Sequence, residues 1–413
     1  MKYVILLGDG MADYPIVELD GKTVIEAAHT PAMDYIAEEG TIGRIDTIPA
    51  GFTPGSDVAN LSVLGYDPVK AHSGRGPLEA ASMGITLASS DIAFRCNLVT
   101  LDNTDVGMSR MDDFTAGHIS SEEARILIDY LNKELGSPRI AFHSGVGYRH
   151  LMVWSGTPLL LNTTPPHDIV GREIDPFFPR GKGADDIKEL MVRSRKVLAD
   201  HPVNKQRVAK GKKPATSIWL WGEGGAPHIA PLTEHYHIRG AVISAVDLLK
   251  GIGVYAGLEV LEVEGATGYI DTNYRGKAEC ALQYLEKGDF VFLHVEAPDE
   301  MGHEGDVRRK IQAIEYFDSD VVDTVLKGLR KLGEFRIVVL SDHPTPVSMK
   351  THVADPSPFA VFSSRAEENL RQRCPFGETN ANKSGITISP GYLLMEYFIN
   401  GWGDFVKKRR SEN

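Results

Sequence analysis

The chain has 413 residues, which is enough for two domains and a large buried core. Apolar residues make up 42% and charged residues 24%, as in ordinary globular proteins, and the formal net charge of -12 argues against nucleic acid or an anionic membrane as a partner. The three cysteines lack metal-type spacing, and no apolar segment is long enough for a signal peptide or a membrane span. These features predict a cytoplasmic protein.

The N-terminal part of the chain is predicted to alternate strands and helices. A strand over residues 3–7 precedes a helix that begins after Thr30, a plausible N-cap followed by proline. A second strand is expected over residues 43–48. The Gly/Pro-rich turn at 51–57 then leads into a further helix with apolar residues at helical spacing.

The middle of the chain has a different composition. Strand-like runs at 92–101 and 151–161 flank a helix at 121–135, and proline-rich and basic segments follow. We therefore predict an α+β cap domain inserted into a discontinuous core. The expected boundaries are residues 91–235 for the cap and residues 1–90 with 236–413 for the core.

The C-terminal part returns to alternation. Strands are expected at 258–263, 290–294 and 335–340, and helices at 275–285 and along an apolar stripe from 311 to 329. Such alternation predicts a parallel-rich sheet with helices on both faces, which places the core in the α/β class.

Six side chains of metal-ligand type follow the predicted strands or lie on the next helix: Asp9, Asp299, His303, Asp342, His343 and His352. In an open parallel sheet, such side chains meet beyond the carboxyl ends of the strands. Alone, an Asp-His pair is an ordinary loop start, and two polar residues four apart are an ordinary helical pair. Together they predict a dinuclear site, and mixed nitrogen and oxygen donors suit Mn²⁺ or Zn²⁺ better than Mg²⁺.

Ser56 opens a helix after the Gly/Pro turn. A serine at this place is most often an N-cap, but a helix N-terminus is also where a phosphoryl group is best held. A metal bound to the hydroxyl would lower its pKa and make the alkoxide available near neutral pH. The residues therefore predict phosphoryl transfer through a serine.

Several short motifs resemble known families. Four motifs resemble signatures of the alkaline phosphatase superfamily: Gly8-Asp9-Gly10-Met11, Thr30-Pro31-Ala32-Met33-Asp34, Pro54-Gly55-Ser56-Asp57 and Ser341-Asp342-His343. Five further motifs resemble those of the archaeal-type cofactor-independent phosphoglycerate mutases: Gly65-Tyr66-Asp67-Pro68, Gly74-Arg75-Gly76-Pro77-Leu78-Glu79-Ala80, Phe94-Arg95-Cys96-Asn97, Tyr148-Arg149-His150 and Trp219-Leu220-Trp221-Gly222. The motifs are collinear over nearly the whole chain.

The resemblance implies a role for each candidate residue. Ser56 would be the nucleophile that becomes phosphoserine, with Lys277 nearby to stabilise the transferring phosphoryl group. One cation would be held by Asp9, Ser56, Asp342 and His343. The other would be held by Asp299, His303 and His352. Two divalent ions are implied, most readily Mn²⁺, with Mg²⁺, Zn²⁺ and Co²⁺ also accepted.

The substrate implied is a small phosphorylated carboxylate. Its anionic groups would be bound by Arg75, Arg95, Arg149 and His150. The phosphoryl group of 3-phosphoglycerate would pass to Ser56 and return to the other hydroxyl to give 2-phosphoglycerate, without bisphosphoglycerate. The cap would close to exclude water from the phosphoserine. His167-Asp168 also resembles a family motif, but no role follows for it.

Two departures from the mutase pattern keep alternatives open. Asn60 stands where a histidine is expected, and Pro344 follows His343 where a serine is more usual. A homoserine-kinase-like phosphotransferase of the same family is one alternative, and a metal-dependent phosphohydrolase or sulfatase is another. A regulatory protein with a relic fold is a third, but every ligand position is filled.

Overall fold

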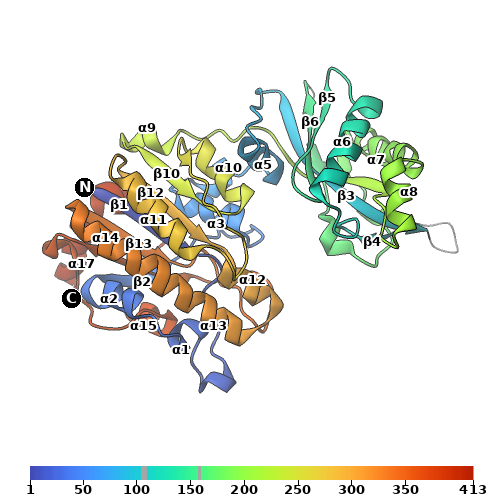
Figure 1. The fold of residues 1–413 in the computed structure, drawn as a ribbon. Helices are drawn as coiled ribbons and strands as arrows, with labels where there is room; N and C mark the ends of the chain where they lie inside the picture. The colour runs from blue at the N-terminus through green and yellow to red at the C-terminus, as the bar shows by residue number, and fades with distance from the viewer. Residues whose placement is uncertain (104–108, 157–159, 413) are drawn as a thin grey trace. The chain divides into compact units, whose positions relative to one another are not determined.

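We describe the protein from a computed structural model that covers residues 1–103, 109–156 and 160–412 (Figure 1). Two compact units are present: the first contains Met1–His72 and His228–Asn413, and the second contains Ser73–Pro227. Helix α5 (Arg75–Ser82), which falls within the expected core segment 1–90, packs on the sheet of the second unit.

The first unit is built around an eight-stranded sheet with the order β11-β10-β12-β1-β13-β14-β2-β15. Every strand runs in the same direction except β14, which is antiparallel to both of its neighbours. The strands are β11 (Glu259–Val260), β10 (Gly240–Ile243), β12 (Phe290–Val295), β1 (Lys2–Gly8), β13 (Phe335–Leu340), β14 (Ser357–Ser363), β2 (Thr41–Ile45) and β15 (Thr387–Ile388).

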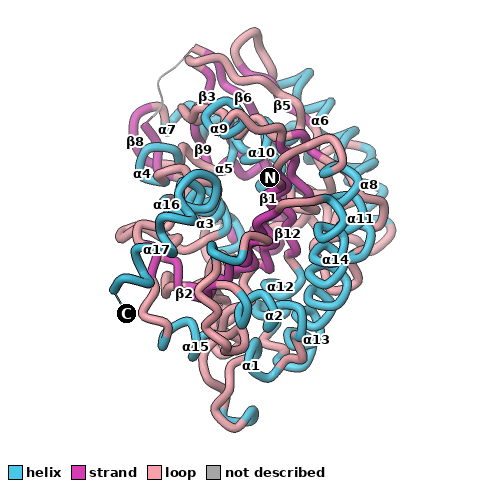
Figure 2. Tube along the Cα trace, turned by 90° about the vertical axis from the view of Figure 1, so that its left-hand side faces the viewer, coloured by secondary structure: helices cyan, strands magenta, loops and turns pink. Residues whose placement is uncertain are grey.

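The central strands are mainly apolar because helices cover both faces of the sheet. In Figure 2, α11 (Tyr274–Leu285) and α14 (Asp323–Leu332) lie to the right of the strands, and α3 (Ser56–Val63) and α16 (Leu393–Glu396) lie to the left. Alternate residues of β1 point to opposite faces, and residues 4–7 are fully buried on both faces. This arrangement confirms the expected α/β class.

The sheet order places three loops side by side. Strand β1 pairs with β12 on one side and β13 on the other, with Leu7 opposite both His294 and Leu340. The residues that follow these strands therefore emerge together at the carboxyl edge. Among the elements expected from sequence, the second strand ends at Ile45 rather than at residue 48, and the strand expected at 258–263 is only two residues long.

The second unit is an antiparallel sheet covered by helices. Strand β3 (Asp91–Asn103) is the centre and pairs with β4 (Ser109–Asp113), β6 (Arg149–Ser155) and β9 (Ser217–Gly224). Helix α6 (Ser121–Leu135) has the bounds expected from sequence, whereas strand β9 was not expected. The strand expected at 151–161 corresponds to β6, and its residues 157–159 lie outside the described residues.

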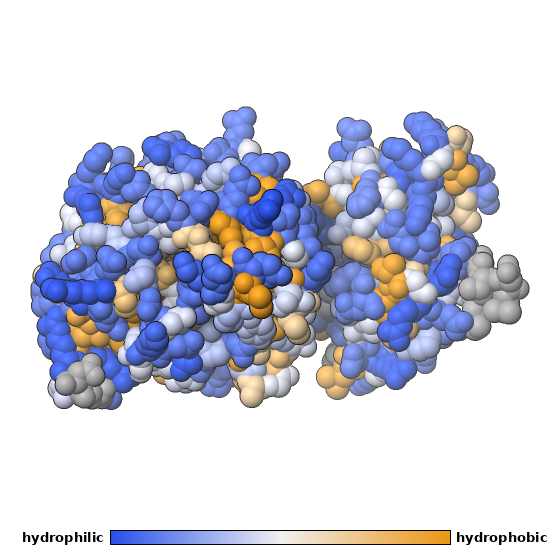
Figure 3. Space-filling view, turned by 90° about the horizontal axis from the view of Figure 1, so that it is seen from below, coloured by the Kyte–Doolittle hydropathy of each residue, from blue (hydrophilic) through white to orange (hydrophobic). Residues whose placement is uncertain are grey.

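The surfaces of both units are mainly hydrophilic. Figure 3 shows that hydrophilic residues dominate the visible face of each unit and are interrupted by smaller hydrophobic patches. Within residues 1–103, 109–156 and 160–412, no helix combines the length and the apolar content needed to cross a membrane.

Candidate metal centre

The first unit gathers the seven side chains expected to form the centre. They come from the loops after β1 and β13, from the start of α3, from α12 (Ala297–Glu304) and from the loop before β14. They are Asp9, Ser56, Asp299, His303, Asp342, His343 and His352. Four of them are buried, Ser56 is partly exposed, and His303 and His352 keep 35% and 20% of their side-chain surfaces exposed. The centre therefore lies at the carboxyl edge of the sheet. Its two partly exposed histidines are His303, on α12, and His352, in the loop before β14.

Ser56 is the first residue of α3, and its side chain is partly exposed. The residue that caps this helix is Gly55, and no side chain makes a capping hydrogen bond. The interpretation of Ser56 as a simple N-cap is therefore wrong. Its Oγ instead lies 3.2 Å from Nε2 of His343.

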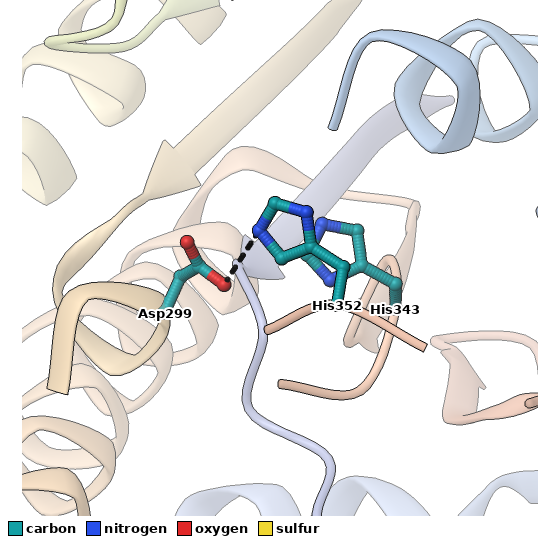
Figure 4. A group of neighbouring side chains, drawn as sticks. All are labelled: Asp299, His343 and His352. Carbon is teal, nitrogen blue, oxygen red and sulfur yellow. Dashed lines mark ion pairs between the residues drawn. The ribbon is translucent and has the colours of Figure 1, made fainter. Parts of the chain in front are cut away.

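One group of ligand atoms surrounds Asp299. Nε2 of His303 lies 3.1 Å from one carboxylate oxygen of Asp299, and Nε2 of His352 lies 3.4 Å from the other. Figure 4 shows the ion pair between Asp299 and His352. The two Nε2 atoms are 2.9 Å apart. Each Nδ1 faces a backbone carbonyl, at 3.1 Å from Lys350 and 3.4 Å from Pro54, so Nδ1–H is the donor there. Once Nε2 carries no proton, the lone pairs of both rings are directed at one point, as in ligands of a shared cation.

The second group surrounds Asp9. Nε2 of His343 lies 3.4 Å from Asp9 Oδ1 and 3.5 Å from Asp342 Oδ2. Asp342 is fixed by hydrogen bonds from the Gly10 amide, at 3.1 Å to Oδ1, and from the Asn60 side chain, at 2.9 Å to Oδ2. Asn60, which departs from the expected histidine, thus supports a ligand. Gly10 itself has a positive φ of 57°.

One oxygen of this group lacks the partner that its burial demands. Within the described residues, Asp9 Oδ1 is buried and accepts no hydrogen bond. A buried carboxylate oxygen without a donor costs free energy, which a bound cation would remove. The donor set, with three imidazoles, three carboxylates and a hydroxyl, therefore fits two divalent cations.

A threonine joins the two groups. The Thr345 hydroxyl donates to Oδ1 of Asp299, and its oxygen lies 3.3 Å from Nδ1 of His343. The rings of His343 and His352 are 4.2 Å apart at their centroids. Figure 4 shows the two rings overlapping beside the Asp299 carboxylate. Ligand atoms of Asp299, His343 and His352 all lie within 4.8 Å of one another. The two groups thus form one continuous centre.

The electrostatics also favour cations. Burial raises the pKa of Asp9, and the nearby charges of Asp342, Glu296 and Asp299 raise it further. Burial alone would raise the pKa of Asp299, but hydrogen bonds from His303 and His352 hold it well below its usual range. The hydrogen bond with Asp299 raises the pKa of His303 to about 9. A cation that binds here therefore displaces a proton.

Lys277 lies on α11 and is fully buried. Its ammonium donates to the backbone carbonyl of His294, at 3.3 Å, at the end of β12. Burial lowers its pKa to about 8, against the opposing effect of the Glu296 carboxylate. The residue therefore places a positive charge at the edge of the centre, beside β12.

Two residues of the centre were missed in the sequence analysis. Nε2 of His294 lies 2.8 Å from Asp9 Oδ2, and Glu296 Oε2 lies 3.5 Å from the same nitrogen. Burial, followed by the charge of Asp299, raises the pKa of Glu296 to about 8. An imidazole inside the apolar run of β12, with an acid two residues later, was the pattern that could have revealed them.

The remaining candidates lie in the second unit. The Arg95 guanidinium lies 4.2 Å from the ring centroid of Trp221, and its Nε is 2.8 Å from the Glu79 carboxylate. Burial lowers the pKa of Arg95, and the nearby charges of Arg75 and Arg149 lower it further. The structure thus brings these three arginines into one cluster of positive charge.

Two histidines lie near the arginines. His150 is only 2% exposed, burial lowers its pKa to about 3, and its Nδ1 accepts a hydrogen bond of 3.0 Å from the Gly145 amide. Burial therefore favours the neutral imidazole, and the substrate-binding role of His150 stays a prediction. The ring of His167, for which sequence gave no role, lies 5.3 Å from that of Trp221.

Known proteins resemble this chain in sequence and in fold. The sequence model of a family described as 2,3-bisphosphoglycerate-independent phosphoglycerate mutase matches residues 37–204. A mutase of that name from Methanosarcina barkeri is 55% identical over 94% of this chain and 96% of its own. A solved structure from Pyrococcus horikoshii has a TM-score of 0.81 and 31% identity and covers 97% of both chains. A cofactor-independent phosphoglycerate mutase from Thermoplasma acidophilum has a TM-score of 0.65 and 27% identity, over 96% of this chain and 99% of its own.

Fold, site and relatives together define an α/β enzyme with a centre for divalent metal ions. The chain belongs to the family of 2,3-bisphosphoglycerate-independent phosphoglycerate mutases, which are isomerases. The resemblance found in the sequence is therefore confirmed.

Proposed function

We propose that the protein interconverts 3-phosphoglycerate and 2-phosphoglycerate through a phosphoserine at Ser56, without bisphosphoglycerate. The observation that supports this most directly is the Ser56 hydroxyl, which makes no capping bond and lies 3.2 Å from a ligand nitrogen of His343. The relatives that share about half of its residues have the mutase name. The three free cysteines fit action in the reducing cytoplasm.

The residues of the first unit divide the work. Asp9, Asp342, His343 and the Ser56 hydroxyl would hold one cation, and the remaining ligands, Asp299, His303 and His352, would hold the other. When bound, the cations supply Lewis-acid stabilisation of the phosphoryl oxygens and lower the pKa of the serine hydroxyl. Mn²⁺ suits the mixed imidazole and carboxylate donors, and Zn²⁺, Co²⁺ and Mg²⁺ are the other candidates.

Ser56 begins α3, so the partial positive charge of the helix N-terminus faces the phosphoryl group that forms on its Oγ. Lys277 adds a positive charge at the edge of the same centre. Both effects stabilise negative charge on the transferring group. Water must be kept from the phosphoserine, since otherwise the enzyme would release free phosphate.

The arginine cluster of the second unit is proposed to bind the anionic groups of the substrate. Arg95 is oriented by Trp221 and Glu79 and is thus prepared for bidentate contact with a carboxylate or phosphate. Arg75 and Arg149 contribute further positive charge.

Phosphorus NMR of the Mn²⁺-loaded protein tests this function. With 3-phosphoglycerate and no bisphosphoglycerate, we expect the 2-phosphoglycerate resonance to appear and the Ser56→Ala variant to leave the spectrum unchanged. Free phosphate would indicate a hydrolase instead. An unchanged spectrum with the native protein, followed by turnover of ATP and homoserine, would indicate the kinase-like alternative.

A further inference from the structure

Three polar side chains form a row across adjacent strands at the carboxyl edge of the large sheet. Ser244 follows β10, His294 is on β12, and Asp9 follows β1, and the three strands are neighbours in that order. The register pairs Ile243 with Leu293 and Leu7 with His294, so the three side chains point to the same face. All three residues are at most 3% exposed.

The direction of the hydrogen bonds in this row follows from their chemistry. His294 Nε2 lies 2.8 Å from the Asp9 carboxylate, which only accepts, so Nε2 holds the ring proton. The ammonium of Lys277 at the His294 carbonyl, together with full burial, favours the neutral ring, whose Nδ1 is then an acceptor. The Ser244 hydroxyl, 3.2 Å away, donates to Nδ1, and its oxygen accepts from the Val246 amide at 3.0 Å.

This tautomer is opposite to that of the candidate ligands. As ligands, His303 and His352 would keep the proton on Nδ1 and bind through Nε2, whereas His294 holds its proton on Nε2. Asp9, His294 and Glu296 lie close enough together to surround an ion, but the nitrogen of His294 that faces Asp9 has no free lone pair. His294 is therefore placed as a hydrogen-bond donor to a ligand.

We propose that His294 is a positioning residue that selects which oxygen of Asp9 binds the cation. Its Nε2–H occupies Asp9 Oδ2, which leaves Oδ1 free, and Oδ1 lies 3.4 Å from Nε2 of His343. Ser244 sets the tautomer of His294. Such outer partners orient a ligand, and their loss typically weakens metal affinity. The inference rests on the proposed metal-dependent function and names one more residue of that centre.

Mn²⁺ titration of the metal-free protein by calorimetry tests this role without an activity readout. His303→Ala in every protein removes a ligand of the other cation, so the remaining strong step reports on the Asp9 group. We expect His294→Leu to weaken this step by about 10- to 100-fold. His294→Gln keeps an N–H donor near the position of Nε2, and we expect it to restore most of the affinity. Ser244→Ala should lie between native and His294→Leu.

The outcomes separate this inference from the function on which it rests. Equal weakening by His294→Leu and His294→Gln, or native affinity in both, would contradict the positioning role alone. Three strong steps in the protein without the His303 change would also contradict it, because His294 would then be a ligand. A native protein that binds no Mn²⁺ would overturn both the inference and the proposed function. Far-ultraviolet circular dichroism checks that each variant is folded, and Ser244→Ala keeps the test decisive should His294→Leu not fold.

Discussion

At the carboxyl edge of the large sheet, the buried charged groups are mainly carboxylates, whereas the second unit gathers guanidinium groups beside aromatic rings. The first region has a buried oxygen on Asp9 that no donor reaches within the described residues. In the second, Arg95 is stacked on Trp221 and paired with Glu79. The first region thus contains a buried acceptor that a bound cation would satisfy. In the second region, the guanidinium group of Arg95 is already held by its neighbours without an anion.

The largest effect should come from the nucleophile. We expect Ser56→Ala to lower kcat by about 10⁴-fold or more, because the covalent route is lost. Ser62→Ala, on the same helix, is a matched control: it removes only a buried hydrogen bond to the Thr47 carbonyl, at 2.6 Å. Turnover by Ser56→Ala near the native rate, measured by phosphorus NMR, would exclude the phosphoserine.

Metal removal should affect the first region and spare the second. We expect a chelator to abolish turnover and Mn²⁺ to restore it. Mn²⁺ at about 100 times its Kd should also stabilise the folded state by about 2.7 kcal/mol. Thermal unfolding measures this gain, which Asp299→Asn should reduce and Arg95→Ala should keep. A gain that is equal in both variants would mean that the ion binds elsewhere.

A buried ion pair next to the centre should affect stability more than activity. All three donors of the Lys310 ammonium are used, at 2.9 Å to Asp13 Oδ2, 2.8 Å to the Thr345 carbonyl and 3.3 Å to the Ala12 carbonyl. We expect Lys310→Met to cost about 3–5 kcal/mol, because it leaves the Asp13 carboxylate buried without its partner. Urea unfolding measures the loss. Recovery of stability on adding Asp13→Leu would show that the unpaired charge is the cause.

The smallest effect should come from replacing an arginine of the second unit by lysine. Arg95→Lys keeps the charge but loses the stack on Trp221 and the planar donor fork. We expect KM for 3-phosphoglycerate to rise about tenfold, which corresponds to about 1.4 kcal/mol, with kcat nearly unchanged. Arg193→Lys, at an exposed helical pair with Glu189, is the control. A fall in kcat alone would place Arg95 in the chemical step instead.

How much of this was predictable depends on how local the pattern is. Asp9 and Asp342 follow short apolar strands, so their places at the sheet edge could be expected from sequence. The local pattern of β12 could have marked His294, but its role could not be predicted, because that role depends on the register between β10, β12 and β1. Strand β9 was missed because proline and basic residues precede its short apolar run. Helix α5 joins the second unit through contacts with distant strands.

The close packing around Gly10 limits which substitutions are tolerated at this position of the centre. A Cβ at this position would overlap both the Asp299 carboxylate and the Thr345 hydroxyl. Its φ of 57° adds a backbone strain that other residues tolerate poorly. Even alanine would push apart the two ligand groups at the point where Thr345 joins them. The lack of a side chain at position 10 therefore allows the loop that carries Asp9 to pack closely against Asp299.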